Sequence, residues 1–146
     1  MKKILTLAGG YSNEREISLI TAKSVIKELK KDRKYNILLT EPDGNFVKKL
    51  RKFRPDLVLN LLHGRYGEDG YIQSILESER VKYTHSGVLS SSLAIDKEIS
   101  KKIFIKNKIL TPPYIKFNFK NNINFKNIIK KVDLKLKFPV VLKPIN

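Results

Sequence analysis

Short apolar runs alternate with amphipathic stretches along the first part of the chain. The run Lys3–Ala8 is almost continuously apolar and is followed by Gly9 and Gly10, as is typical of a strand buried on both faces. The runs Tyr35–Thr40 and Leu57–Leu61 predict two more strands, separated by a turn at 42–44 and a short basic segment that favours a helix. Because strands that alternate with helices pair in parallel, the expected fold class is α/β with a parallel sheet.

Apolar residues at helical spacing predict the helices that cover this sheet. One helix carries Leu19, Ala22, Val25, Ile26 and Leu29. Asn13 is its predicted N-cap, with Glu16 as the capping-box partner three residues later. A further helix carries Ile72, Ile75 and Leu76, and Asp69 is the residue expected to cap it.

The next part of the chain predicts one more strand and one long helix. Val81–Tyr83 has the character of a fourth short strand. A single helix is predicted from Ser90 to about Lys106. Its buried stripe is expected to consist of Ile95, Ile99 and Ile103, with Lys97 on the opposite face.

A proline pair marks the expected domain boundary. Proline cannot continue a helix, so Thr111-Pro112-Pro113 ends the helical region and divides the chain into domains 1–111 and 112–146. In the second part we expect an extended segment at 114–119, a turn at Asn121-Asn122, a helix over Asn124–Val132 and a buried strand over Phe138–Pro144. Because the chain stops directly after that strand, the second domain is expected to be incomplete.

The charge of the chain raises the possibility of a nucleic-acid partner. The formal net charge is +16, and 24 of the 30 basic residues are Lys, spread along the chain rather than clustered. Base-reading proteins favour bidentate Arg and interleaved aromatic rings, and neither pattern is present. We therefore expect no nucleic-acid partner.

Composition also limits the compartment and the metal chemistry. There is no cysteine and there are only two histidines, which excludes disulfides and thiolate zinc sites, and no metal ligand is predicted. The apolar start of the chain is too short for a signal peptide, and no stretch approaches the roughly 20 apolar residues that cross a bilayer. We expect a cytoplasmic protein without a membrane partner.

Three segments concentrate glycine with chemically active side chains. They are GGYSNEREIS (9–18), LHGRYGEDG (62–70), and a serine-rich and lysine-bearing stretch over 83–101 that contains SSSLAIDK. Each has an ordinary explanation, since acids cap helices, a histidine after a strand is often structural, and most lysines are solvated. Their order and spacing make the combination more specific than any one of them.

Together these segments, and the terminal FPVVLKP (138–144), resemble the D-alanine–D-alanine ligases of the ATP-grasp superfamily. The resemblance implies a Rossmann-like pre-ATP-grasp domain, a parallel sheet flanked by helices, followed by the start of the ATP-grasp central domain. It also implies ATP and D-alanine as substrates, magnesium as cofactor, and a homodimer.

The resemblance assigns roles to four residues of this chain. Glu14 matches the acid that holds the ammonium of the first D-alanine, and His63 matches the histidine beside that substrate, so these two are the candidate catalytic residues. Lys97 and Lys143 match the lysines that face the nucleotide. His85 matches no role that we can assign.

The implied reaction is formation of D-alanyl-D-alanine for peptidoglycan, through an acyl phosphate made from ATP. The chain contains about the first half of the family pattern and lacks its serine-rich loop, arginine and acidic magnesium ligands, so we expect it to be inactive alone. Two alternatives stay open: a D-alanine–D-lactate type ligase, and a basic binding module without catalytic activity.

Overall fold

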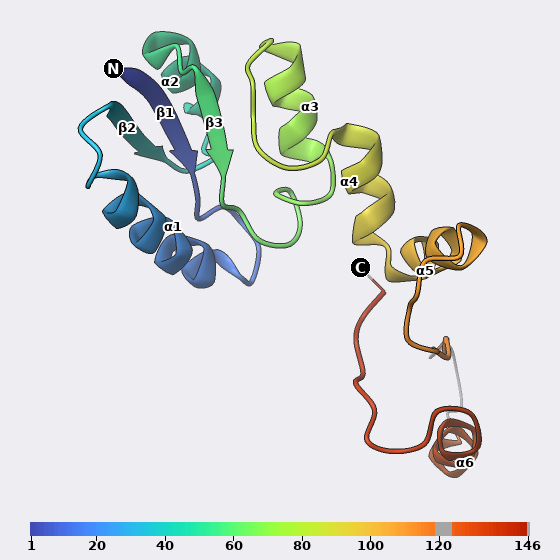
Figure 1. The fold of residues 1–146 in the computed structure, drawn as a ribbon. Helices are drawn as coiled ribbons and strands as arrows, with labels where there is room; N and C mark the ends of the chain where they lie inside the picture. The colour runs from blue at the N-terminus through green and yellow to red at the C-terminus, as the bar shows by residue number, and fades with distance from the viewer. Residues whose placement is uncertain (119–123, 146) are drawn as a thin grey trace. The chain divides into compact units, whose positions relative to one another are not determined.

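The computed structural model describes residues 1–118 and 124–145. The chain forms two compact units, Met1–Ile95 and Asp96–Asn146, which we call the amino-terminal and carboxy-terminal units and describe separately (Figure 1). The predicted domain boundary at Thr111 concerns the domains of the implied ligase and stays a prediction.

A three-stranded parallel sheet forms the centre of the amino-terminal unit. Its strands are β1 (Lys2–Leu7), β2 (Tyr35–Thr40) and β3 (Leu57–Asn60), in the order β2-β1-β3. Both neighbours of β1 pair with it in parallel, Ile4 lying opposite Ile37 on one side and opposite Leu57 on the other. The predicted α/β class and parallel sheet are confirmed.

The predicted fourth strand is reduced to an isolated bridge between Val58 and Tyr83. Val58 exchanges backbone hydrogen bonds with Lys82 and Thr84. The ladder ends there because the N–H of Asn60 donates to the side-chain Oγ1 of Thr84 instead of to a backbone carbonyl.

Helices lie on both sides of this sheet (Figure 1). They are α1 (Arg15–Leu29), α2 (Phe46–Phe53), α3 (Tyr71–Ser78) and α4 (Val88–Ile95). Because side chains alternate along a strand, Leu5 and Leu7 of β1 face one side, where they join a core with side chains of β3, α2, α3 and Leu62. Ile4 and Thr6 face the other side, and α1, which contacts β1, buries Ser18 and Ala22.

The starts of two helices differ from the prediction. Among the described residues, no side chain caps α1. The helix begins at Arg15 with Glu14 in the N-cap position, so Asn13 lies one residue too early to cap it. The N–H of Glu14 donates to the hydroxyl of Ser12. Gly70 occupies the N-cap position of α3, and Asp69 accepts the N–H of Tyr71 from one residue further out.

The predicted single helix over 90–106 is wrong, because the chain turns at Asp96. Asp96 has an extended backbone, and its carboxylate accepts the N–H groups of Glu98 and Ile99, which caps a separate helix α5 (Lys97–Lys106). The expected buried stripe is therefore split between two helices. Ile99 and Ile103 are more than one-third exposed, and no described residue of α5 is buried.

The carboxy-terminal unit also contains α6 (Phe125–Leu136), whose amino end is capped by Asn124. The predicted helix Asn124–Val132 is confirmed and extends four residues further. The segment 114–118 is neither helix nor strand, in agreement with the expected extended chain; residue 119 and the predicted turn Asn121-Asn122 lie outside the described residues.

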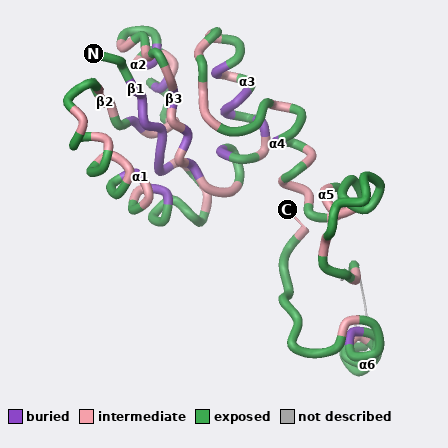
Figure 2. Tube along the Cα trace, viewed as in Figure 1, coloured by how far each residue is buried: buried purple, intermediate pink, exposed green. Residues whose placement is uncertain are grey.

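The predicted buried strand Phe138–Pro144 is wrong, because this segment pairs with no strand in the described part of its unit. Val141 and Leu142 are about 80% exposed. Figure 2 shows the contrast: buried residues gather in β1, β3, α2 and α3, while α5 and the last segment are mostly exposed. None of the described helices is long and apolar enough to cross a membrane.

Candidate functional site

The loops that follow β1 and β3 are joined by one buried hydroxyl. Ser18 of α1 is fully buried; its Oγ accepts the N–H of Gly9 at 2.8 Å and donates to the carbonyl of Leu61 at 2.6 Å. Carboxyl ends of parallel strands lie at one edge of a sheet, where open α/β folds bind ligands. Ser18 therefore holds the first two glycine-containing motifs together at that edge.

Ser12 makes a second connection between these motifs. Its Oγ donates to the carbonyl of His63 at 2.7 Å and accepts the N–H of Glu14 at 3.2 Å. A methyl group added to Gly64 would lie 2.6 Å from Oε2 of Glu14, so this carboxylate lies directly against Gly64. The backbone N–H of Glu14 and the backbone carbonyl of His63 therefore share the hydroxyl of Ser12, so the two predicted residues lie close together.

Glu14 and His63 differ in their surroundings. Glu14 is exposed, and within the described residues its carboxylate has no ion pair or hydrogen bond, so it is open to a cationic group from outside. His63 is half-buried, with Nε2 at 3.2 Å from Oγ1 of Thr21. The other acids nearby are engaged with the backbone: Glu68 accepts the N–H of Gly64, and Asp69 accepts that of Tyr66.

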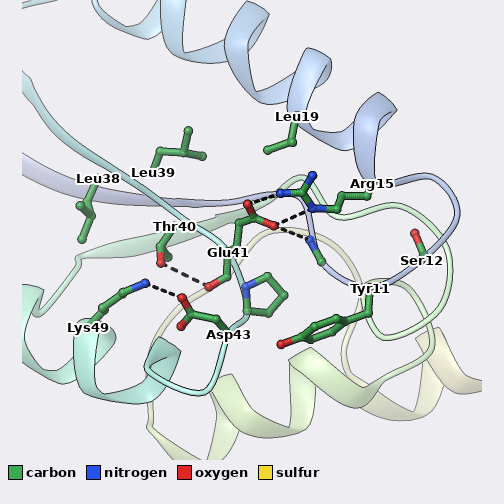
Figure 3. Close-up of a pocket in the computed structure, with 12 residues that line it drawn as sticks. Tyr11, Ser12, Arg15, Leu19, Leu38, Leu39, Thr40, Glu41, Asp43 and Lys49 are labelled. Carbon is green, nitrogen blue, oxygen red and sulfur yellow. Dashed lines mark hydrogen bonds and ion pairs between the residues drawn. The ribbon is translucent and has the colours of Figure 1, made fainter.

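An ion pair supports the loop between Gly10 and Glu14 from the side of β2. The carboxylate of Glu41 accepts two hydrogen bonds from the guanidinium of Arg15, one from Nε at 3.0 Å and one from a terminal nitrogen at 2.6 Å. It also accepts the N–H of Gly10 at 3.3 Å (Figure 3). Hydrogen bonding from Arg15 lowers the pKa of Glu41, and the same bond raises the pKa of Arg15. Glu41 therefore joins both ends of the loop that carries Glu14.

This ion pair lines a hollow of about 960 Å³ beside β2 and the start of α1 (Figure 3). The hollow includes neither Glu14 nor His63. Its charged side chains are paired with each other, Arg15 with Glu41 and Lys49 with Asp43 at 2.7 Å. We assign no substrate to this hollow, because its charges are already neutralised.

The predicted nucleotide-binding lysines come together in the carboxy-terminal unit. Lys97 and Lys143 line one hollow of about 540 Å³. Lys97 also donates two hydrogen bonds to the carbonyl of Ile145, one from its backbone N–H at 2.9 Å and one from its Nζ at 3.4 Å. Lys101 lines the same hollow and donates to the carbonyl of Pro112 at 2.6 Å.

The acid that lines this second hollow is paired. Glu98 bonds Lys102 at 2.8 Å and also contacts Lys116. Hydrogen bonds from Lys102 first, and from Lys116 second, lower the pKa of Glu98. The charge of Glu98 is balanced in this way, and the lysine side of the hollow remains cationic.

Comparison with known proteins supports the resemblance. No protein-family model matches the chain. The D-alanine–D-alanine ligase of Pelagibacter ubique is 63% identical over 145 residues, which is 99% of this chain and 47% of that protein. The ligase of Carboxydothermus hydrogenoformans is 45% identical over 141 residues, covering 97% of this chain and 45% of that protein. The chain is similar to D-alanine–D-alanine ligases along almost its whole length. It spans about half the length of the curated relatives that it matches.

Solved ligase structures share the fold. The D-alanine–D-alanine ligase of Bacillus anthracis, in a crystal structure complexed with ATP, has a TM-score of 0.71 and 35% identity over 89% of this chain and 44% of that chain. D-alanyl-alanine synthetase A of Vibrio cholerae, at 24% identity and a TM-score of 0.70 over 90% of this chain and 45% of that one, supports the fold alone. The resemblance predicted from the motifs is confirmed.

Sequence analysis gave no role to three residues that support the site: Ser18 lies at the end of the first motif, and Thr21 and Glu41 lie outside the motifs. Ser18 and Thr21 lie four and seven residues after Glu14. Helical spacing could therefore have predicted that both lie on the side of α1 that continues from Glu14. Glu41 had no comparable signal, because its partner Arg15 is 26 residues away in sequence.

The residues to which the resemblance assigns roles are divided between the two units. Glu14 and His63 lie in the amino-terminal unit, while Lys97 and Lys143 lie in the carboxy-terminal unit. Among the described residues there is no group of three or more His, Asp or Glu side chains that could hold a metal ion.

Proposed function

We propose that this chain acts within an ATP-dependent ligase that joins two D-alanine molecules. The chain is 63% identical to a protein named D-alanine–D-alanine ligase along almost its whole length. The observation that carries the proposal is the meeting of the first two motifs, with the Glu14 carboxylate against Gly64 beside His63. An exposed acid and an imidazole at the carboxyl edge of a parallel sheet suit a small amino acid.

In this proposal Glu14 binds the ammonium of the first D-alanine, and His63 lies beside its carboxylate. A charge-assisted hydrogen bond of this kind contributes about 1.5–3 kcal/mol. Glu14 suits the role because its carboxylate has no partner within the described residues. Ser12 and Ser18 hold the backbone on which both residues depend.

Lys97 and Lys143 are proposed to bind ATP. Lysine ammonium groups suit phosphate oxygens as point charges, and both residues line one cationic hollow. When bound, ATP would transfer its terminal phosphoryl group to the carboxylate of the first D-alanine, leaving ADP and an acyl phosphate. Attack by the amine of the second D-alanine would then form the amide bond and release phosphate. The lysines would neutralise phosphate charge and keep the nucleotide oriented.

Magnesium does not fit the residues that the structure describes. Oxygen-rich clusters bind this ion, and the described part of the chain has no such group. The ligands of magnesium are therefore proposed to come from outside this chain.

Further proposals follow from the family rather than from this structure. They are an amino-terminal substrate domain over 1–111, the start of the ATP-grasp central domain over 112–146, a homodimer, a cytoplasmic location, a role in peptidoglycan synthesis, no nucleic-acid partner, and inactivity of the chain alone.

A hybrid ligase tests the proposed activity. This chain would replace the matching 145 residues of the Pelagibacter ubique ligase, whose 63% identity favours a compatible interface. We expect D-alanine-dependent release of phosphate from ATP together with D-alanyl-D-alanine. The control is the unaltered Pelagibacter ubique ligase under the same conditions.

The hybrid also separates the ligase from the binding module. The D-alanine–D-lactate alternative stays open, because the residues that choose the second substrate are expected outside this chain. A folded hybrid that forms no D-alanyl-D-alanine, beside an active control, would refute the proposed function and favour a binding module.

A further inference from the structure

The hydroxyl of Thr21 lies between two polar groups. Its Oγ1 is 2.9 Å from the carbonyl oxygen of Ile17, one turn earlier in α1, and 3.2 Å from Nε2 of His63. A hydroxyl has one hydrogen to donate and two lone pairs with which to accept. The carbonyl of Ile17 can only accept, so the shorter contact uses the single hydrogen of Thr21. Towards His63, Thr21 is then an acceptor.

We propose that Thr21 is a positioning residue that holds the neutral ring of His63 as the Nε2–H tautomer, so that His63 acts on its ligand through Nδ1. An acceptor at Nε2 requires a hydrogen on Nε2, and a neutral imidazole has only one such hydrogen. Within the described residues no hydrogen bond reaches Nδ1 of His63. Nδ1 is therefore the nitrogen that is open to a ligand.

The backbone around His63 is restrained as well as the ring. Ser18 donates to the carbonyl of Leu61, and Ser12 donates to the carbonyl of His63 itself. With Thr21 at Nε2, the position of the ring is set from α1 and from the loop before α1. A restrained imidazole presents Nδ1 in one direction, and ligand binding then requires less ordering of the side chain.

The open nitrogen defines what His63 can do. Neutral His63 offers an acceptor at Nδ1, and protonated His63 offers a donor at the same atom. A carboxylate is thus met by the protonated ring and an ammonium by the neutral ring. Only the nature of the ligand, D-alanine, rests on the proposed function; the tautomer is a property of this chain.

The competing hydrogen-bond arrangement predicts the opposite tautomer. If Thr21 donated its hydrogen to Nε2 of His63, the carbonyl of Ile17 would lose its hydrogen bond from the hydroxyl of Thr21. The single ring hydrogen of neutral His63 would then be on Nδ1. The hydrogen on the ring therefore reports directly which role Thr21 takes.

Nitrogen NMR of the 146-residue chain distinguishes these arrangements. Histidine would be labelled with ¹⁵N and measured about two pH units above the ordinary imidazole pKa of about 6.5. The variant His85→Gln assigns the two rings. We expect the shift of a protonated nitrogen at Nε2 of His63 and that of a bare nitrogen at Nδ1; the reverse would overturn the proposal.

Variants of α1 test whether Thr21 is responsible. Thr21→Val keeps the shape without the hydroxyl and should lose the slowly exchanging Nε2–H signal of His63, while Thr21→Ser should retain it. Ser24→Ala is the matched control, because the hydroxyl of Ser24 bonds, within the described part of the chain, only the carbonyl of Ile20 in the same helix, at 3.2 Å.

Two outcomes count against the assignment to Thr21. They are an unchanged His63 ring signal in a folded Thr21→Val chain, and loss of that signal in Ser24→Ala. If Thr21→Val does not fold, the comparison of the parent with Thr21→Ser decides, since loss of the signal in the serine variant also refutes the proposal. An inactive hybrid ligase would leave these spectra unaffected, so the two proposals fail separately.

Discussion

Glu14 and Glu16 both lie at the start of α1, and both are exposed. They differ in what surrounds them. The carboxylate of Glu14 rests against Gly64 beside His63, whereas Glu16 belongs to the first turn of the helix, where an acid interacts favourably with the helix dipole. Removing one charge at each position separates ligand binding from helix stability.

In the hybrid ligase, Glu14→Gln should lower the apparent efficiency for the first D-alanine about ten- to a hundredfold, because a bond of about 1.5–3 kcal/mol to the ammonium is lost. Saturation with ATP should hardly change. Glu16→Gln is the control and should leave D-alanine saturation as in the parent. A Glu14→Gln enzyme that melts lower but saturates normally would mean that Glu14 serves only the helix.

The Arg15–Glu41 pair predicts a pH dependence of stability. Because hydrogen bonding from Arg15 lowers the pKa of Glu41 in the folded chain, the stabilisation is present above the ordinary value of 4.5 and is lost as the pH falls through the lowered value. The effect should be small, since the side chains are 48% and 37% exposed and solvent screens them.

Urea unfolding of the parent and of Glu41→Gln should therefore differ most near pH 7 and converge in acid. Asp133→Asn serves as the control, because Asp133 is exposed and its carboxylate has no ion pair among the described residues. A stability difference for Glu41→Gln that grew in acid would mean that the pKa of Glu41 is raised, not lowered, by folding.

At the scale of the elements, the contact between α1 and the strand ends depends on Ser18. Its hydroxyl satisfies the N–H of Gly9 and the carbonyl of Leu61, and Ser18 itself is fully buried. Ser18→Ala would leave both backbone groups without this partner, and a buried unsatisfied group costs about 1–3 kcal/mol.

We expect Ser18→Ala to lower the free energy of unfolding by about that amount in urea titrations followed by circular dichroism. Ser74→Ala is the matched control, since Ser74 is exposed and, among the described residues, its hydroxyl bonds only the nearby carbonyl of Tyr71. The control should stay within about 0.5 kcal/mol of the parent. Equal effects of both substitutions would show that Ser18 does not connect the two loops.

At the scale of the whole molecule, the net charge of +16 is the most unusual property. Cations bound to DNA phosphates release counterions, so such binding weakens steeply as salt increases. We predict that any retention on DNA disappears between about 50 and 200 mM salt and is the same for unrelated sequences. Tight and sequence-selective binding at the upper salt level would favour the binding-module alternative over the ligase.

Local pattern accounts for most of the amino-terminal unit. β1, β2, α1 and α3 were predicted close to their observed positions, because a strand inside a parallel sheet is a short apolar run and burial repeats every 3.6 residues in a helix. The break at Asp96 was missed although its signal is local, since an Asp two residues before an acid is an ordinary helix start. The strand predicted at 138–144 failed because a strand also needs a neighbour to pair with.

The sequence by itself determined the α/β class, the parallel sheet, the resemblance to the ligases and the candidate residues Glu14, His63, Lys97 and Lys143. Only the tertiary structure decided which side chains support them. Glu41 reaches Arg15 across 26 residues, Thr21 reaches His63 across 42, and Ser18 reaches Leu61 across 43. Periodicity records which face of an element is buried, but contacts this distant in sequence depend on which strand ends become neighbours in the sheet.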